Sequence, residues 1–165
     1  MTIVMRVIID SGILMNVTSW AALEDDVYTS PLVFGELKSS LSQQLFALAD
    51  EYNRIQIVKP LAKYVAKVRA AASDIGQDRL SDADCEILGL ALQMKEEDEV
   101  LLLSDDFGLR NVSIKLEIKS KGVKTTKQIR KREYKYICNA CQTSYDYLVD
   151  ECEVCGHTHF KRKIK

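Results

Sequence analysis

Short apolar runs alternate with amphipathic stretches over the first 125 residues of the chain. The apolar runs end at polar or turn-forming residues and predict buried strands at 4–9, 27–29, 55–58 and 100–103, with a last edge strand at 122–125. Between them, apolar residues recur at helical spacing, which predicts helices at 31–37, from there to about 53, at 60–76, 81–92 and 108–118. Strands that alternate with helices predict an α/β fold, a parallel sheet with helices on both faces.

The pattern changes at about residue 126. Residues 127–135 (KQIRKREYK) have no apolar face and are typical of a linker. Four cysteines then follow within eighteen residues, at 138, 141, 152 and 155. We therefore expect one α/β domain at 1–125, a basic linker at 126–135, and a small cysteine module with a basic tail at 136–165.

Charge is unevenly distributed along the chain, although the net charge is only −1. Residues 1–112 hold 10 Lys and Arg against 18 Asp and Glu, a net of −8, and residues 113–137 hold 9 against 2, a net of +7. The last 28 residues balance at 4 against 4. An acidic domain followed by a basic segment suits a protein that binds a metal ion through carboxylates and also binds a polyanion.

Length and apolar content limit the classes of protein that remain. The 165 residues allow one ordinary domain and a small appendage, and no apolar run approaches the roughly 20 residues that span a bilayer. The first ten residues carry no basic start and no small-residue cleavage site, so we expect no signal peptide and no membrane association. A cytoplasmic protein is expected, in which disulfides are rare.

Acidic side chains follow the predicted strands and begin the predicted helices. Ligands of open parallel sheets bind beyond the carboxyl ends of the strands, so acids at those ends meet if their strands are neighbours. Divalent Mg²⁺ or Mn²⁺, which prefer carboxylate oxygens, would relieve the mutual repulsion of such a cluster. The sequence therefore predicts a catalytic Mg²⁺ or Mn²⁺ site among Asp10, Glu36, Asp82, Asp84, Asp105 and Asp106.

Most of these acids also have an ordinary structural interpretation. Asp84 could complete a capping box with Ser81, and Asp82 could complement the helix dipole. Asp105 and Asp106 could be turn residues, and Glu36 could be a solvated helix residue. Asp10 is harder to explain in this way, because it ends an apolar strand. The two histidines lie beyond residue 125, so no Ser-His-Asp or Cys-His arrangement competes.

Residues 1 to about 125 resemble the PIN-domain nucleases. The resemblance lies in the segments IIDSG at 8–12, SPLVFGEL at 30–37, LSDAD at 80–84 and LLSDDFGLRNV at 102–112. It implies that the family's four acids correspond to Asp10, Glu36, Asp84 and Asp105, with Asp82 and Asp106 close by. Gly12 departs from the first motif, where an apolar residue is usual, but this removes no ligand.

The cysteine spacing predicts a structural zinc site. Cys138-x2-Cys141 and Cys152-x2-Cys155 supply two thiolate pairs, as in tetrahedral Zn²⁺ sites, with disulfides as the alternative. A module of about thirty residues has little core, so zinc would supply much of its folding energy. We expect His157 and His159 to be surface residues and Cys85 to be a buried core thiol.

The basic residues around this module are candidates for RNA binding, together with interleaved aromatics at 134, 136, 145, 147 and 160. At least two of these aromatics would instead form the module's own core, and charge runs are often only solvated linkers. The candidate RNA-binding residues are Lys127, Arg130, Lys131, Arg132, Lys135, Lys161, Arg162 and Lys163.

The order of a PIN domain, a basic linker and a C-terminal zinc ribbon resembles the Nin-one-binding protein family. That resemblance implies a metal-dependent endoribonuclease that cuts precursor ribosomal RNA to form the mature 3′ end of the small-subunit rRNA, leaving 5′-phosphate and 3′-hydroxyl ends. It also implies the precursor small ribosomal subunit and a KH-domain assembly factor as partners. The alternatives are a toxin-type PIN ribonuclease acting on tRNA or mRNA, and a non-catalytic RNA-binding assembly factor.

Overall fold

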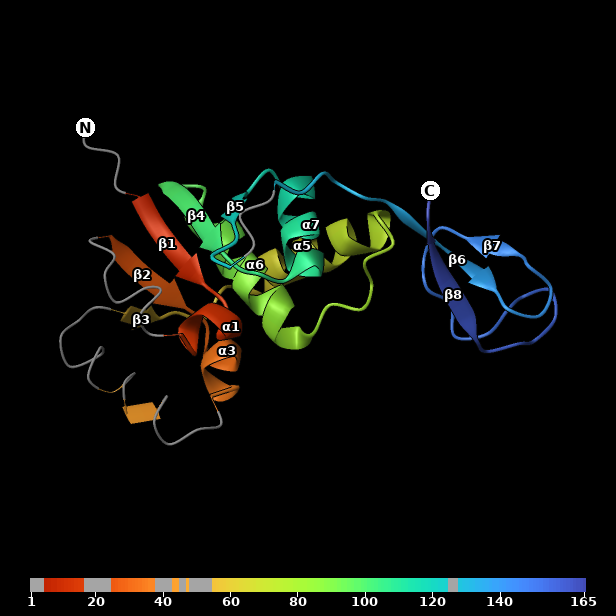
Figure 1. Cartoon of the computed structure of the whole chain (residues 1–165), viewed down its shortest axis with the longest axis horizontal. Coiled ribbons are helices and arrows are strands. Elements are labelled where there is room, and N and C mark those ends of the chain that lie inside the picture. Colours follow the sequence, from red (N-terminus) through yellow and green to blue (C-terminus); the bar gives the residue numbers. More distant parts are fainter. Residues whose placement is uncertain (1–4, 17–24, 38–42, 45–46, 48–54, 125–127) are drawn as a thin grey trace.

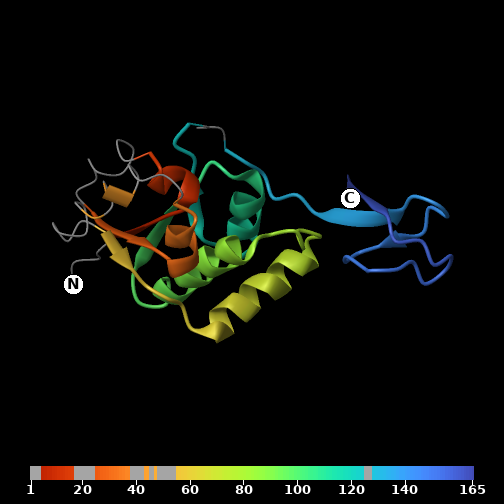
Figure 2. The same ribbon diagram turned by 90° about the horizontal axis from the view of Figure 1, so that it is seen from below.

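The computed structural model contains a five-stranded parallel sheet with its helices and a separate three-stranded antiparallel sheet (Figures 1 and 2). It describes residues 5–16, 25–37, 43–44, 47, 55–124 and 128–165. The larger sheet has the order β3-β2-β1-β4-β5 and every pair is parallel. Its strands are β1 (Met5–Ile9), β2 (Asp26–Thr29), β3 (Ile55–Ile57), β4 (Glu99–Leu103) and β5 (Lys119–Lys121).

Two of the described helices, α3 and α6, begin at the predicted capping residues. Ser30 caps α3 by accepting a hydrogen bond from Val33 N at 3.4 Å, with Pro31 in the first turn. Ser81 and Asp84 form the predicted capping box at the start of α6. The helices are α1 (Ser11–Leu14), α3 (Pro31–Gly35), α5 (Ala62–Asp74), α6 (Asp82–Met94) and α7 (Phe107–Lys115).

The core lies between the parallel sheet and α6. The central strands β1 and β4 carry fully buried side chains such as Ile8 and Leu102, and α6 packs on both strands through Ile87 and Leu90. In Figure 1 the helices α5, α6 and α7 stand beside the sheet, between it and the smaller sheet. The predicted parallel α/β domain joined to a small zinc ribbon is confirmed. No helix in the described residues is long and apolar enough to cross a membrane.

One predicted strand differs from the structure, and one predicted helix lies mostly outside the described residues. The edge strand predicted at 122–125 is wrong, because the chain pairs with β4 earlier, at Lys119–Lys121. An edge strand with one free side tolerates the polar sequence Lys-Ser-Lys, so no apolar run marks it. The helical pattern predicted between 37 and 53 falls mostly outside the described residues.

The smaller sheet has the order β7-β6-β8. Its strands are β6 (Tyr134–Cys138), β7 (Ser144–Tyr145) and β8 (Phe160–Ile164). β6 begins inside the range predicted as linker, and its first residues are bonded to the loop after α5. Tyr134 N donates to Ile75 O at 2.8 Å, and the fully buried Tyr136 donates its hydroxyl to Gly76 O at 3.1 Å. Burial, then the charge of Asp78, raises the pKa of Tyr136 to about 12.

Gly76 makes this close contact possible, and its replacement tests the junction. The residue has φ +67°, and an added Cβ would lie 2.4 Å from Tyr134 O. Gly76→Ala should therefore lower the free energy of unfolding by about 1–3 kcal/mol in denaturant titrations. Gly35→Ala is the control, because a Cβ there meets nothing within 4 Å. Equal stabilities of the two variants would contradict the contact.

Candidate active site and zinc centre

The carboxyl ends of the central strands bring the first acid to the edge of the sheet. β1 and β4 are parallel neighbours with Ile9 opposite Leu103, so Asp10 and Ser104 emerge side by side. The Asp10 side chain is 7% exposed. Its Oδ1 accepts a hydrogen bond from Ile13 N at 2.9 Å, and its Oδ2 accepts one from the hydroxyl of the fully buried Ser104. Asp10 is thus held in one orientation at the carboxyl ends of β1 and β4, the edge of the sheet here called the crevice.

Helices α3 and α6 bring two more acids to this region. Asp84 lies in the first turn of α6, where its Oδ2 accepts hydrogen bonds from Ser81 N at 3.1 Å and from Ser81 Oγ at 2.8 Å. Glu36 is half-buried at the end of α3. The two helices are joined because Glu86 Oε1 accepts a hydrogen bond from Leu32 N at 3.0 Å.

The electrostatics of these acids show which of them share one region. Burial, and to a lesser extent the charges of Asp106 and Asp84, raises the pKa of Asp10. Burial, then the charges of Asp106 and Glu36, raises the pKa of Asp84. The charges of Asp84 and Asp106 therefore act on Asp10, and those of Asp106 and Glu36 act on Asp84, so these acids occupy one region.

Three of the predicted acids form other contacts, which hold them in different surroundings. Asp82 is turned to solvent and forms an ion pair with Arg69 at 2.5 Å. Asp105 Oδ1 accepts hydrogen bonds from Val123 N at 2.9 Å and Lys124 N at 3.0 Å, so it fixes the chain after β5. Asp106 caps α7 by accepting a bond from Leu109 N at 2.7 Å.

Two polar residues of the site were not singled out by the sequence. Ser104 stands between Leu103 and the acid pair, and its hydroxyl both donates to Asp10 and accepts from Asp106 N at 3.0 Å. Glu86 is a buried acid within the apolar stripe of α6. The sequence contained a signal for each of them, because a polar residue at a strand end and an acid among buried apolar positions both need a hydrogen-bond partner.

The donor set fits a divalent cation. Two carboxylates, Asp10 and Asp84, whose pKa values are raised by burial and by neighbouring acids, are stabilised when a hard cation shares their charge, and oxygen ligands suit Mg²⁺ and Mn²⁺. Within the described residues, the acids do not approach one another as closely as the cysteines do. A more open cluster leaves room for water and substrate oxygens around an ion.

The four cysteines form a compact cluster. Their Sγ atoms all lie within 4.8 Å of one another, with Cys138 and Cys155 3.6 Å apart and Cys141 and Cys152 3.5 Å apart. Four thiolates around a tetrahedral Zn²⁺ with bonds of about 2.3 Å would stand about 3.8 Å apart, so the cluster fits that ion. All five cysteines are free thiols, and Cys85 is buried in α6 as expected.

A neighbouring hydroxyl group favours the thiolate form of one of these cysteines, Cys152. The Tyr145 hydroxyl lies 3.2 Å from Cys152 Sγ, and this hydrogen bond foremost lowers the pKa of the thiol to about 6. A thiolate is the form that binds zinc. Among the aromatic candidates, Tyr134 and Tyr136 are buried, whereas Tyr147 is exposed. Tyr134 and Tyr136 are thus structural residues, and both also bond to the loop after α5, outside the module whose own core they were expected to form.

The candidate RNA-binding residues lie in two groups, and Lys127 is outside the described residues. Arg130, Lys131 and Arg132 are exposed in the segment before β6. On the smaller sheet, Lys135 stands directly opposite Lys163 in the antiparallel pair of β6 and β8. Lys161, Arg162 and Lys163 are exposed, and Arg162 lies over the Tyr134 ring at 4.3 Å.

The comparison with protein families defines the class. Residues 7–94, more than half of the chain, match the family described as the PIN domain of ribonuclease. This range contains Asp10, Glu36 and Asp84, three of the acids at the crevice. The chain is therefore a PIN-domain protein, and PIN nucleases use divalent metals.

Curated relatives narrow the class. The chain is 32% identical over 143 residues to endoribonuclease Nob1 of Methanocaldococcus jannaschii, covering 86% of this chain and 68% of that protein. Nob1 of Methanothermobacter thermautotrophicus is 30% identical, with 78% and 77% covered. Nob1 of Pyrococcus abyssi is 28% identical, with 94% and 92% covered, a range that includes the cysteine module. The chain belongs to the Nob1 endoribonuclease family.

Proposed function

We propose that this protein is a metal-dependent endoribonuclease that cuts precursor ribosomal RNA at the 3′ end of the small-subunit rRNA. The observation that carries the proposal is the crevice at β1 and β4, where Asp10 shares its electrostatic surroundings with Asp84 and Asp106. The match to Nob1 of Pyrococcus abyssi over 94% of the chain, including the cysteine module, favours this over a toxin-type PIN ribonuclease. The intact acids count against a non-catalytic assembly factor.

In this proposal the acids have distinct roles. Asp10, Glu36, Asp84 and Asp105 would hold Mg²⁺ or Mn²⁺, with Asp82 and Asp106 as auxiliaries. Of the last pair, Asp106 is the better placed, because its charge acts on both Asp10 and Asp84. When bound, the metal would activate water for in-line attack and stabilise the charge on the leaving 3′ oxygen. The products would carry 5′-phosphate and 3′-hydroxyl ends.

Other residues would keep the acids in place rather than take part in the reaction. The hydroxyl of Ser104 and the main chain of Ile13 hold both oxygens of Asp10, so the carboxylate meets an ion without reorganising. The bond from Leu32 to Glu86 fixes the distance between the helices that carry Glu36 and Asp84. The cysteine module would bind structural Zn²⁺.

The proposed setting is the precursor small ribosomal subunit in the cytoplasm, with a KH-domain assembly factor as a further partner. The test uses model RNA that spans the 3′ end of the small-subunit rRNA, incubated with the protein and Mn²⁺. We expect one mapped cut with a 5′-phosphate on the downstream product. Cleavage of tRNA or mRNA in preference to this RNA would favour the toxin-type activity, and no cleavage would favour an assembly factor.

We propose that most contacts with RNA phosphates come from the basic segment, residues 128–133, and from the ribbon, the three-stranded module at 134–165. The first 112 residues have a net charge of −8, so away from the crevice they repel RNA. Replacing Arg130, Lys131 and Arg132 together by Ala should weaken binding to many RNA sequences about equally. It should also flatten the fall of affinity with salt, because fewer counterions are released.

A matched charge change controls this experiment. Lys59→Ala, Lys63→Ala and Lys67→Ala remove the same charge at and just before α5, and should alter affinity and salt dependence much less. Binding titrations at two salt concentrations compare the two triple variants. If both leave affinity and its salt dependence as in the wild type, the basic segment is only a solvated linker.

A further inference from the structure

The basic segment before β6 is anchored on the nuclease domain by one buried amide. Asn111 lies in α7 with no exposed surface. Its Oδ1 accepts a hydrogen bond from Arg132 N at 2.7 Å, and its Nδ2 donates one to Arg132 O at 2.8 Å. One side chain thus satisfies both main-chain groups of Arg132, as a neighbouring strand would. The main chain at this position is therefore fixed on α7.

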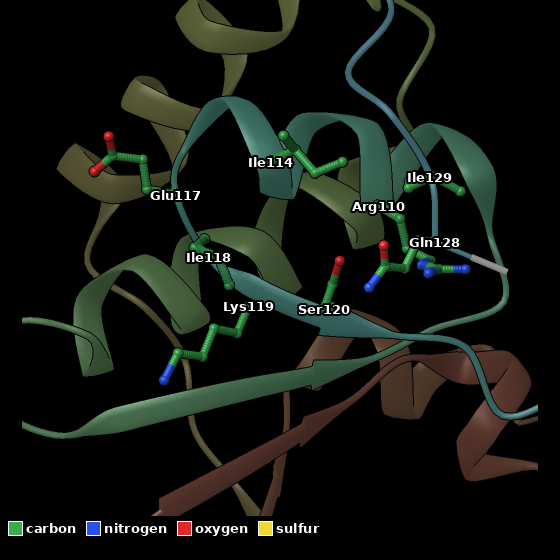
Figure 3. A pocket seen from close by; sticks show the side chains of 8 residues that line it. All are labelled: Arg110, Ile114, Glu117, Ile118, Lys119, Ser120, Gln128 and Ile129. Atoms are coloured by element: carbon green, nitrogen blue, oxygen red, sulfur yellow. The ribbon is translucent and has the colours of Figure 1, made fainter. Parts of the chain in front are cut away.

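The segment follows α7 on both sides of this anchor. Upstream, Gln128 and Ile129 line a pocket of about 360 Å³ together with Arg110 and Ile114 of α7 and Ser120 of β5 (Figure 3). Downstream, Tyr134 is bonded to Ile75. The segment thus lies along the helix whose first residue follows Asp106.

The side chain of Arg132 is also placed by a contact with α7. Its guanidinium carbon lies 4.8 Å from the centre of the Phe107 ring, and Phe107 is the first residue of that helix, next to Asp106. A guanidinium stacked on an aromatic ring keeps its N–H donors in the plane and able to bind an anion. Arg132 is exposed, so such an anion can reach it.

The neighbouring basic residues are not held in this way. Lys131 forms an ion pair with Glu133 at 3.0 Å. Within the described part of the chain, no hydrogen bond or ion pair holds the Arg130 side chain. Arg132 is thus distinguished by its anchored main chain and by its side chain, which lies over the ring of Phe107, the residue that follows Asp106.

We propose that Asn111 is a positioning residue, which holds Arg132 so that its guanidinium binds an RNA phosphate next to the one that is cleaved. The inference rests on the proposed function and assigns one step of it. The cluster of acids repels the phosphates that flank the reacting bond, and a guanidinium held over Phe107, the residue after Asp106, would offset that repulsion. A preorganised group loses little freedom on binding, so it favours the aligned substrate more than a mobile lysine does.

The test compares two variants with the same change in charge. Arg132→Ala and Arg79→Ala each remove one exposed positive charge, and Arg79 lies outside the basic segment and the acidic site. Arg132→Ala should lower the single-turnover cleavage rate at saturating protein by about 10- to 100-fold, and Arg79→Ala should leave it within about twofold of the wild type. Arg132→Lys should restore affinity but not the rate, because an ammonium lacks the planar fork of donors.

Asn111 is tested through its coupling to Arg132. Asn111→Ala should lower the cleavage rate as Arg132→Ala does, and the double variant should be no slower than either single one. A merely structural role for Asn111 would give additive losses. Thermal unfolding identifies variants that fail to fold, and Arg132→Ala, an exposed change, keeps the proposal testable if Asn111→Ala does not fold.

The outcomes separate this inference from the proposed function. If the wild type cleaves and Arg132→Ala cleaves as fast as Arg79→Ala, the positioning role is wrong and the nuclease function stands. If the wild type does not cleave RNA in Mn²⁺, both are overturned. A slow Arg132→Ala whose rate recovers fully in Arg132→Lys would show that only charge matters, and would also overturn the assigned geometry.

Discussion

Asp10→Asn is expected to lower RNA cleavage in Mn²⁺ by on the order of 10³-fold, to background, while RNA affinity stays nearly unchanged. The substitution removes the charge that a cation would share, but the amide keeps the shape of the carboxyl group. It can still cap α1 towards Ile13 N, as asparagine commonly does at helix starts. Cleavage by Asp10→Asn at the wild-type rate would show that the crevice is not the site of reaction.

The same variant should be more stable than the wild type in the absence of metal. Burial foremost raises the pKa of Asp10 in the folded protein, so the charged form is disfavoured there. The stability that the acid contributes is present below its unfolded pKa, which is about 4, and is lost as pH rises through the raised folded value. The melting temperature of Asp10→Asn should therefore exceed that of the wild type increasingly above pH 4, with EDTA present.

Asp26→Asn provides the matched control for cleavage. Asp26 is exposed at the start of β2, the opposite end of the sheet from Asp10. It should leave the cleavage rate as in the wild type. Addition of Mn²⁺ should close the stability gap between the wild type and Asp10→Asn, because only the wild type keeps the full set of ligands.

The second large effect concerns zinc. Elemental analysis of the purified protein should find about one Zn²⁺ per chain, and Cys138→Ser with Cys141→Ser should abolish it. Without the ion the module beyond about residue 134 should unfold, because zinc supplies about 10–16 kcal/mol to sites of this kind. The nuclease domain should keep a cooperative transition, since its core lies between α6 and the parallel sheet.

Cys85→Ser is the control for this experiment, because it removes a buried thiol of α6 that lies outside the cluster. It should cost some stability and keep the zinc. Near-ultraviolet circular dichroism and two-dimensional NMR would follow the ribbon signals in both variants. Stoichiometric disulfides with no zinc in freshly isolated protein would overturn the zinc site.

The sequence was sufficient to predict features that depend on residues close together in the chain. The apolar runs before Asp10 and Ser104 marked the two central strands, and Ser30 and Ser81 marked the helix starts at the crevice. The spacing of Cys138, Cys141, Cys152 and Cys155 predicted the cluster, because each pair of ligands needs only one tight turn.

Contacts between distant segments could not be predicted in this way. Asp105 and Asp106 are adjacent in the chain, and only the path of the chain after β5 decides that Asp105 turns to Val123 N. The role of Asp105 as a metal ligand remains a prediction. The anchoring of Arg132 by Asn111 was equally hidden, because a basic segment without an apolar face has the composition of a free linker.

The pairing of Lys135 with Lys163 has a thermodynamic consequence. Like charges directly opposite each other oppose the pairing of two strands, so β6 and β8 come together against a repulsion that exists only in the folded module. A polyanion on that face removes the repulsion, and zinc favours the same folded state. Linkage then requires each ligand to tighten the other, so a ribbon bound to RNA should need a higher chelator concentration to lose its metal than a free one.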